Sequence, residues 1–321
     1  MNTESNQYAI GIDIGGTGTK YGFVNHRGEI TYSGSDIRTN EYNKVEDFVN
    51  DLYDKLKPTI DVVGIEKIKG IGVGAPNGNI YTGTIDYAPN LPWREIVPLA
   101  RLVSEKFGLP CFLTNDANAA AMGEMMYGAA RGMKNFIVIT LGTGVGSGVV
   151  ANGHMIYGED GFAGELGHTI IRHNGREHWS TGLKGSLEAY ASATGITLTA
   201  KELLETSDEP SLLRDYKPEA INSKIVYECA MKGDNIAKEV YRFTGEVLGE
   251  ALANFIMFSS PKAIILFGGV IKAGDLIMKP TREHMEKNLL PIFQNKVELI
   301  FSELKEADAA ILGASALVWE M

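Results

Sequence analysis

The chain has 321 residues and a formal net charge of -10, and its composition, 44% hydrophobic and 22% charged, is that of a soluble globular protein. An acidic chain of this kind is not drawn to nucleic acid or to anionic lipid, so we expect neither as a partner. The length suits two domains, and the two widely separated cysteines, Cys111 and Cys229, indicate neither a disulfide framework nor a thiolate metal site. Without a signal-peptide pattern or an apolar segment of membrane-spanning length, the sequence predicts a cytoplasmic protein with no membrane association.

The first part of the chain predicts buried strands that end in glycine turns. Residues 8–14 form an apolar, β-branched run that stops at Gly15 and Gly16, and an antiparallel meander follows. Apolar residues at helical spacing then indicate a helix that Pro58 ends. The predicted elements are strands at 8–14, 20–25 and 29–33, a helix at 45–56, a strand at 68–73, a helix at 99–107, a strand at 111–114 and a helix at 117–127.

The second part repeats this plan. The segment IVITLGTGVGSGVVANGHMI has the order of IGIDIGGTGTKYGFVNHRGEI, namely strand, glycine turn, strand, turn and strand. Such an internal echo predicts two domains built on the same core plan. The further elements are a strand at 136–141, a turn at 142–148, a long apolar helix at 237–258, a strand at 263–267 ending at Gly268 and Gly269, and a helix at 309–319. The helix at 237–258 suits the core or an interface, and we favour the core.

Three glycine turns, at 15–19, 142–148 and 268–269, directly follow buried strands. Backbone N–H groups in such turns can converge on a phosphate because no side chain holds the anion away. Asp13 is placed to hold Mg²⁺ through water, and Thr17 with Lys20 to meet phosphate oxygens. Ordinary hairpins would explain one such turn, but three favour phosphate binding. The sequence has no GxxxxGK[ST] and no GxGxxG that opens a helix after a strand, so a P-loop and a dinucleotide-binding unit are not supported.

Asp116 is the candidate catalytic base. It follows a strand and opens an Ala-rich helix, so its carboxylate and the Asn115 amide lie at a sheet edge where α/β proteins bind ligands. The alternative is a helix N-cap, which is favoured for an isolated Asp in this position. Beside phosphate-binding turns we favour the base.

The segment GFAGELGH contains Glu165 and His168, three residues apart and therefore on one face of a helical turn. Together they could bind vicinal hydroxyls, because a carboxylate accepts two hydrogen bonds and a histidine can donate or accept. For an isolated ExxH pattern, a surface turn without function is the favoured alternative. Glu188 follows at some distance.

These segments resemble the ROK family (repressors, unclassified reading frames and sugar kinases) over nearly the whole chain: DIGGTGTKYG, GVGAP, APNLPW, NDANAAA, LGTGVGSG, GELGH and IILFGGV occur in that family's order. The resemblance implies an α/β fold of duplicated actin-like ATPase (ribonuclease H-like) domains with an interdomain cleft. We expect a smaller domain at 1–117 plus 307–321 and a larger one at 118–306. The implied activity is transfer of the γ-phosphoryl group of ATP to the 6-hydroxyl of a hexose, with Mg²⁺, in a protein that the likeness suggests is a homodimer.

The same likeness implies the site residues. Asp116 takes the hydroxyl proton, and the sugar is bound by Asn90, Asn115, Asp116, Glu165, His168 and Glu188. ATP is bound by Asp13, Gly15, Gly16, Thr17, Lys20, Gly142, Thr143, Gly144, Gly268 and Gly269, with Asp13 also holding Mg²⁺ through water.

The chain departs from the family after GELGH. Many members have CxCGxxGCxE there, and its three cysteines with the histidine hold a structural zinc; this chain has WSTGLKGSLE. Trp179, Thr181 and Ser186 are not good zinc ligands, so we predict no zinc, and we interpret the nearby His173 and His178 as solvated loop residues. The family's repressors also place a helix-turn-helix ahead of the first strand, which here begins at about residue 8, so a DNA-binding role is not expected.

The substrate is predicted less sharply. Glucose is the first choice, and N-acetylglucosamine or N-acetylmannosamine are alternatives, because pocket shape reads the 2-substituent. A sugar-binding regulatory protein that transfers no phosphate is an alternative of another class, disfavoured by Asp13, Thr17 and Asp116. An ATPase of the heat-shock type is disfavoured by NDANAAA and GELGH.

Overall fold

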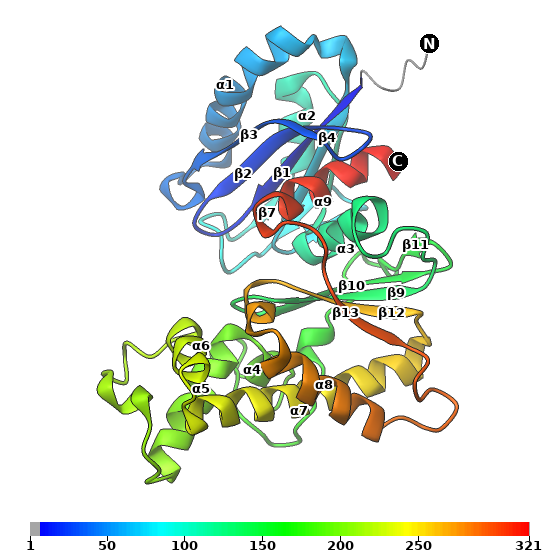
Figure 1. Cartoon of the computed structure of the whole chain (residues 1–321). Coiled ribbons are helices and arrows are strands. Elements are labelled where there is room, and N and C mark those ends of the chain that lie inside the picture. Colours follow the sequence, from blue (N-terminus) through cyan, green and yellow to red (C-terminus); the bar gives the residue numbers. More distant parts are fainter. Residues whose placement is uncertain (1–6, 321) are drawn as a thin grey trace. The chain divides into compact units, whose positions relative to one another are not determined.

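The computed structural model describes residues 7–320, and the contacts within the chain divide it into two compact units (Figure 1). Unit 1 takes residues 7–133, 148–164 and 302–320, and unit 2 takes residues 134–147 and 165–301. None of the helices within residues 7–320 combines the length and the apolar character of a membrane span. The predicted smaller domain at 1–117 plus 307–321 and larger domain at 118–306 stay a prediction.

Unit 1 is built on a five-stranded mixed sheet. From edge to edge, its strands are β3 (Ile30–Ile37), β2 (Thr19–Asn25), β1 (Tyr8–Ile14), β4 (Ile68–Ala75) and β8 (Cys111–Asn115). The first three form the predicted antiparallel meander, and β4 and β8 run parallel to β1. Unit 1 also contains a small antiparallel sheet of three strands, β5 (Gly78–Asn79), β6 (Thr84–Asp86) and β7 (Ile96–Val97).

A second five-stranded sheet repeats the plan of the first. Its order is β11 (His154–Met155), β10 (Val145–Ala151), β9 (Phe136–Leu141), β12 (Ala263–Phe267) and β13 (Glu298–Phe301). β11 is antiparallel to β10, while β12 is parallel to both β9 and β13. Both sheets thus have the order third, second, first, fourth, fifth strand, and the duplication predicted from the internal echo is confirmed.

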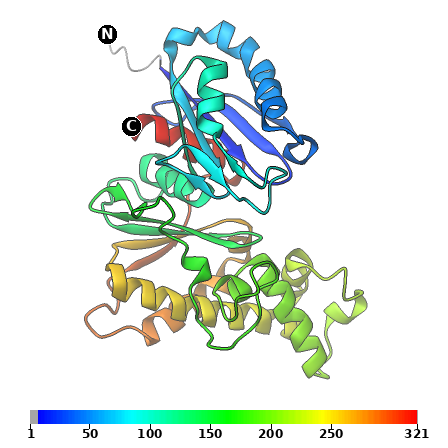
Figure 2. The same ribbon diagram turned by 180° about the vertical axis from the view of Figure 1, so that it is seen from behind.

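Helices cover both faces of the first sheet. α1 (Val45–Val63) and α2 (Leu99–Phe107) share a hydrophobic core with the buried side chains of β1, β4 and β8 (Figure 2). α9 (Glu306–Glu320) packs on β1 and β4 from the opposite face, and α3 (Asp116–Tyr127) packs against α9. The sequence alternates accordingly: Ile10 and Ile12 belong to the core on one face, and Gly11 contacts α9 on the other.

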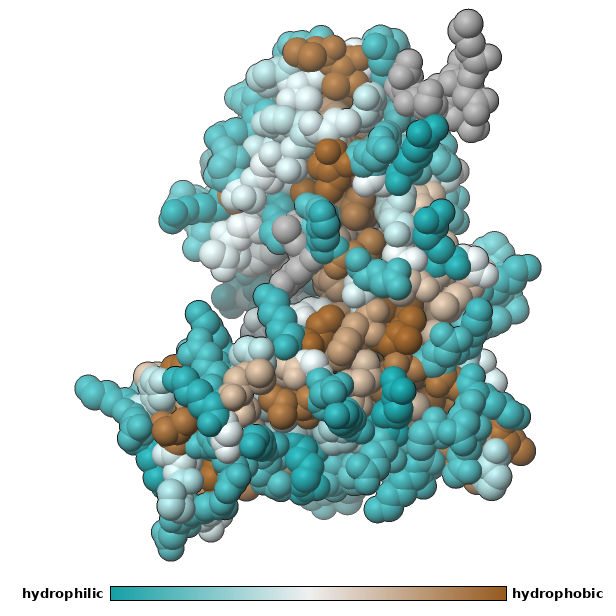
Figure 3. Space-filling model, viewed as in Figure 1, coloured by the Kyte–Doolittle hydropathy of each residue, from teal (hydrophilic) through white to brown (hydrophobic). Residues whose placement is uncertain are grey.

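Unit 2 carries the remaining helices. They are α4 (Glu188–Ala191), α5 (Ala193–Thr206), α6 (Ser223–Met231), α7 (Asn235–Ser259) and α8 (Asp275–Lys287). The apolar helix α7 buries most of its length, including Val240 and Leu248, so its predicted place in the core is confirmed. On the face drawn in Figure 3, the outer surface of these helices is mostly hydrophilic.

The prediction that Pro58 ends the first helix is wrong, because α1 continues through Pro58 to Val63. Proline removes one backbone donor and leaves the carbonyl four residues earlier, at Asp54, without its helical partner. Both residues lie on the exposed side, where water can satisfy that carbonyl, while Ile60 adds a buried side chain to the core. The packing of Ile60 therefore outweighs the helix-breaking tendency of the proline.

Glycines let helix α9 approach the sheet at backbone distance. A Cβ on Gly11 would lie 2.1 Å from the Ile311 carbonyl oxygen, and one on Gly72 would lie 1.9 Å from that of Ala314. The crossing of α3 and α9 is equally close, since a Cβ on Gly123 would lie 2.9 Å from the Cα of Gly313. These contacts fix the position of α3, whose first turn carries the candidate base.

Candidate active site

The first glycine turn joins β1 to β2 and lies against the segment that contains Asn90. In the β1–β2 ladder Asp13 is paired with Lys20, and the Gly15 N–H donates to the Gly18 carbonyl over 3.0 Å. A Cβ on Gly16 would lie 2.5 Å from the Asn90 carbonyl oxygen, so only glycine allows this approach. The structure thus brings Asp13, the turn and the backbone of Asn90 close together.

Asp13, on β1, and Asp116, directly after β8, lie on either side of Gly74, because β4 is the strand between β1 and β8. A Cβ on Gly74 would be 3.8 Å from Asp13 Oδ1 and 3.6 Å from the Asp116 Cα. Burial and then the charge of Asp116 raise the pKa of Asp13 to about 6, against the opposing effect of Lys20. A carboxylate whose proton affinity is raised by burial and by a second carboxylate, beside a glycine, is typical of a functional site.

The N-cap of α3 is Asn115 rather than Asp116. The Asn115 side chain accepts a hydrogen bond from the Ala117 N–H over 2.8 Å, and its backbone is extended as a cap requires. Asp116 Oδ1 accepts from the same N–H over 2.8 Å. The Asp116 side chain meets solvent at its surface, yet desolvation by the surrounding protein raises the pKa of its carboxyl, which the hydrogen bond from Ala117 partly offsets. The cap alternative for Asp116 therefore loses its main support.

The second glycine turn is shorter than predicted. It spans Gly142 to Gly144, where the Gly142 N–H donates to the Gly144 carbonyl over 3.0 Å, and the later glycines of the predicted 142–148 turn lie inside strand β10. The reason is packing: a Cβ on Gly148 would lie 2.5 Å from that of Ala121, so this glycine serves close approach rather than a turn.

The third glycine turn lies beside the second. Gly268 has φ +107°, and a Cβ there would lie 2.6 Å from the Leu141 carbonyl oxygen, at the end of β9. The start of α5 holds the second turn from another side, because the Ala193 N–H donates to the Gly142 carbonyl and the Thr194 hydroxyl to that of Thr143. Both predicted nucleotide turns of unit 2 are thus neighbours.

The predicted sugar ligands of unit 2 form one cluster around a residue that was not predicted. Glu165 Oε2 lies 3.9 Å from His168 Nε2, at a single 3-10 turn. Glu188 Oε1 lies 2.5 Å from His178 Nε2, and its Oε2 accepts from the Val145 N–H over 2.6 Å. The ring centres of His168 and His178 are 5.7 Å apart.

The interpretation of His178 as a solvated loop residue is wrong, since the side chain is buried with 2% of its surface exposed. Its neighbours in the sequence, Glu177 and Trp179, are exposed, so the local pattern carries no signal for a buried histidine. Only the fold, which places the loop over Glu188, reveals its position.

The residues of the predicted zinc-free loop do not fit a tetrahedral zinc site. Trp179 and Thr181 are exposed, and neither offers a thiolate. His168 Nδ1 and the Ser186 hydroxyl are buried without a hydrogen-bond partner among residues 7–320. One imidazole and one alcohol are too few donors to hold zinc.

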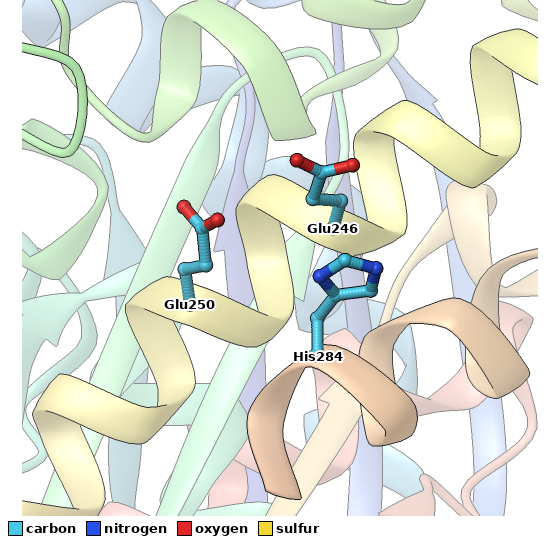
Figure 4. Close-up of side chains that lie close together, drawn as sticks. All are labelled: Glu246, Glu250 and His284. Atoms are coloured by element: carbon cyan, nitrogen blue, oxygen red, sulfur yellow. The ribbon is translucent and has the colours of Figure 1, made fainter. Parts of the chain in front are cut away.

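Within the described part of the chain, a single group of side chains has the spacing of metal ligands, and it lies elsewhere in unit 2. Glu246 and Glu250, one turn apart on α7, and His284 on α8 have ligand atoms within 4.8 Å of one another (Figure 4). Each carboxylate already has a cation partner: Arg242 Nη1 lies 3.0 Å from Glu246 Oε2, and Arg172 pairs with Glu250. We interpret the group as an ion-pair network on the packed helices α7 and α8.

Known proteins have sequences similar to that of this chain. The sequence profile of the ROK family matches residues 9–321. Glucokinase from Halalkalibacterium halodurans is 38% identical over 320 residues, covering 98% of this chain and 96% of that protein. Glucokinase from Thermotoga maritima is 34% identical over 315 residues, covering 97% of each.

A solved structure also resembles this chain in its fold. A ROK family glucokinase from Streptomyces griseus, crystallised with glucose and AMPPNP, matches with a TM-score of 0.81 at 30% identity over 98% of this chain and 100% of that one. The predicted α/β fold of duplicated actin-like ATPase domains is confirmed by this match and by the repeated sheet order. Matched by the family profile over nearly its whole length and by glucokinases at 34% and 38% identity, the chain belongs to the ROK family.

Proposed function

We propose that the protein is an ATP-dependent hexose kinase that transfers the γ-phosphoryl group to the 6-hydroxyl of glucose. Both sequence relatives are glucokinases, and the Streptomyces griseus glucokinase was crystallised with glucose and AMPPNP. The observation that carries the proposal is the approach of Asp13 to Asp116 beside the first glycine turn. Phosphoryl transfer to an alcohol needs a base and a phosphate-binding backbone in one place.

Asp116 acts as the base in this proposal. The raised pKa of its carboxyl supports the role, because a base works best when its proton affinity approaches that required at the working pH. Asp116 accepts the proton of the sugar 6-hydroxyl while that oxygen bonds to the γ-phosphorus of ATP. The bond from this phosphorus to the β–γ bridging oxygen breaks, and ADP leaves with the electron pair.

The other predicted residues divide between the two substrates. Carboxylates and amides can accept hydrogen bonds from sugar hydroxyls or donate hydrogen bonds to them. We therefore assign sugar binding to Asn90, Asn115, Asp116, Glu165, His168 and Glu188. We assign the nucleotide to Asp13, Gly15, Gly16, Thr17, Lys20, Gly142, Thr143, Gly144, Gly268 and Gly269. Gly142 and Gly269 support this, since an added Cβ there would meet no atom within 4 Å and the backbone is open to a phosphate or a base.

Mg²⁺ would be held through water by Asp13. The donor chemistry fits, because Asp13 and the nearby Asp116 offer the carboxylate oxygens that this ion prefers. When bound, the ion neutralises charge on the phosphate oxygens. Lys20, opposite Asp13 in the ladder, adds a fixed positive charge.

A coupled assay for ADP release tests the function, with saturating Mg-ATP and a panel of glucose, N-acetylglucosamine and N-acetylmannosamine. We expect ADP release that depends on glucose. A higher kcat/KM for an acetamido sugar would reassign the substrate, release without sugar would indicate an ATPase, and sugar binding without release would indicate a regulatory protein.

The variant Asp116→Asn tests the base in the same assay. We expect turnover to fall roughly 10²-fold or more with only a modest rise in the KM for sugar, because the lost group acts mainly in the transition state. Asp54→Asn, at an exposed position of α1, is the matched control and keeps wild-type rates. Near-normal turnover of Asp116→Asn would contradict the assignment.

We further propose a cytoplasmic homodimer in which residues 1–117 with 307–321 and residues 118–306 are the two functional domains. The family likeness supports the dimer, and the use of ATP supports the location. Light scattering that gives about twice the chain mass of 34.9 kDa would support the dimer, and a mass near 34.9 kDa would contradict it.

A further inference from the structure

His178 lies in the loop between the 3-10 turn at His168 and helix α4, and its ring is fixed on all sides. The ring stacks on Trp179 with centres 4.1 Å apart and an interplanar angle of 26°. The backbone around it closes a turn, because the His178 N–H donates to the Leu183 carbonyl and the Gly182 N–H donates to the His178 carbonyl. A buried ring held in this way has one orientation.

The hydrogen bonds of the ring define its tautomer. The N–H groups of Ser180 and Thr181 both point at His178 Nδ1, each over 3.2 Å. Two donors at one nitrogen require a lone pair there, so the neutral ring carries its hydrogen on Nε2. That hydrogen is then directed at Glu188 Oε1, 2.5 Å away.

Glu188 is thereby held at both carboxylate oxygens by different segments. His178 binds Oε1, and the Val145 N–H binds Oε2 over 2.6 Å. The carboxylate lies directly under the second glycine turn, since a Cβ on Gly144 would be 2.3 Å from Glu188 Oε2. Each oxygen keeps a further lone pair that can accept from a hydroxyl.

We propose that His178 is a positioning residue of the sugar site, which holds the Glu188 carboxylate in the orientation that accepts hydroxyl groups. One imidazole cross-links the loop backbone at Nδ1 and the ligand carboxylate at Nε2. This inference rests on the proposed function, because binding of sugar by Glu188 is part of it. A carboxylate fixed before the sugar arrives loses less freedom on binding.

Two substitutions separate the two ends of the ring. Gln in place of His178 keeps an N–H near the position of Nε2 and loses the acceptor near Nδ1, whereas Asn keeps the acceptor and loses the donor. We expect His178→Asn to raise the KM and the calorimetric Kd for glucose roughly 10-fold or more, with the KM for ATP changed less than about 3-fold. His178→Gln should restore glucose affinity to within about 3-fold of the wild type, although its loop is less stable.

His173→Asn is the matched control, because this exposed histidine lies in the same loop and should leave affinity and melting temperature unchanged. In a Glu188→Gln background, the His178→Asn effect on glucose affinity should largely disappear, since the two residues act through one contact. If both His178 variants lower the melting temperature but leave glucose affinity within about 2-fold, His178 is only a structural residue and the inference is overturned.

The calorimetric measurement also separates this inference from the proposed function. A wild-type protein that binds glucose but releases no ADP refutes the kinase proposal, while the two His178 variants still test the positioning role through Kd. A wild-type protein that binds none of the three sugars refutes both.

Discussion

Asp13 and Asp116 lie on either side of Gly74. The carboxyl group of each is costly to ionise. Burial and the neighbouring charge raise the pKa of Asp13 from its ordinary value of 3.8 to about 6. Desolvation raises the pKa of Asp116 as well. Such a pair destabilises the protein without its ligands at neutral pH, and the proposed catalysis would require both groups.

Replacement of Asp13 by Asn should stabilise the ligand-free protein at neutral pH. A folded-state pKa above the unfolded one contributes stability that is fully present below pH 3.8 and is lost as the pH rises through about 6. The neutral amide avoids this loss, so Asp13→Asn should gain on the order of 2 kcal/mol at pH 8 and clearly less at pH 4.5. Thermal unfolding at both pH values measures the difference, and an equal gain at the two would contradict the shift.

At the scale of single residues, the sequence singled out Asp13 and Asp116 as candidates, but His178 was wrongly interpreted as a solvated residue. Asp13 lies near the end of one predicted buried strand and Asp116 follows another, so the parallel order of those strands brings them to one edge. His178 has exposed neighbours and no periodic context, and its burial depends on contacts with Glu188, ten residues away. A contact of this kind belongs to the folded loop and cannot be seen in the order of residues.

At the scale of elements, glycines in the middle of β1 and β4 determine how close α9 lies to the sheet. Glycine weakens a strand interior unless another backbone approaches closely, and here the carbonyls of Ile311 and Ala314 do so. The apolar runs containing Gly11 and Gly72 are therefore sheet strands whose backbone is bare at these two positions.

Gly72→Ala should consequently destabilise unit 1 far more than Gly70→Ala, two residues earlier on the same strand and face. The new methyl group at Gly72 would meet the Ala314 carbonyl oxygen at 1.9 Å, whereas at Gly70 the nearest atom, the Pro110 carbonyl oxygen, is 3.0 Å away. We expect a loss on the order of 3 kcal/mol or more for Gly72→Ala and about 1 kcal/mol for Gly70→Ala. Denaturant unfolding compares the two, and equal stabilities would refute the close packing.

Elements that glycine or proline delimits were predicted with the correct bounds, whereas elements whose ends depend on packing were not. The strands at 136–141 and 263–267 and the helix at 99–107 have the predicted bounds because glycine or proline delimits them. The helix through Pro58 and the strand β10, which contains two glycines of the predicted turn, extend further. In both cases contacts with other elements override the local preference of glycine or proline.

At the scale of the whole molecule, residues of both units are assigned to the two substrates. Asp13 and Asp116 belong to unit 1, and Glu165, His168 and Glu188 belong to unit 2. If both sets act on one pair of substrates, binding of the nucleotide and binding of the sugar are linked, and each raises the affinity for the other by the same factor.

Calorimetry of glucose binding with and without AMPPNP measures this linkage. We expect the analogue to lower the Kd for glucose about 5-fold or more, and glucose to lower the Kd for the analogue equally. Asp116→Asn should retain much of the linkage, because the base acts in the transition state rather than in binding. Independent binding of the two ligands would contradict joint action of the two sets.

The duplicated plan was readable from the sequence because each copy carries the same series of strands and turns. The family likeness led us to expect residues 307–321 with residues 1–117, but the sequence does not indicate against which residues the segments 148–164 and 302–320 pack. Glycine contacts such as Gly123 with Gly313 provide that link only once the fold is known.

The packing of α9 on β1 and β4 also has a consequence for folding during synthesis of the chain. Strands β1 and β4 leave the ribosome early, yet the helix that covers one of their faces is synthesised after all of unit 2. Throughout elongation this sheet face stays uncovered, and it is a surface that chaperones would shield. The nascent polypeptide therefore acquires its phosphoryl-transfer machinery only once translation has passed residue 320.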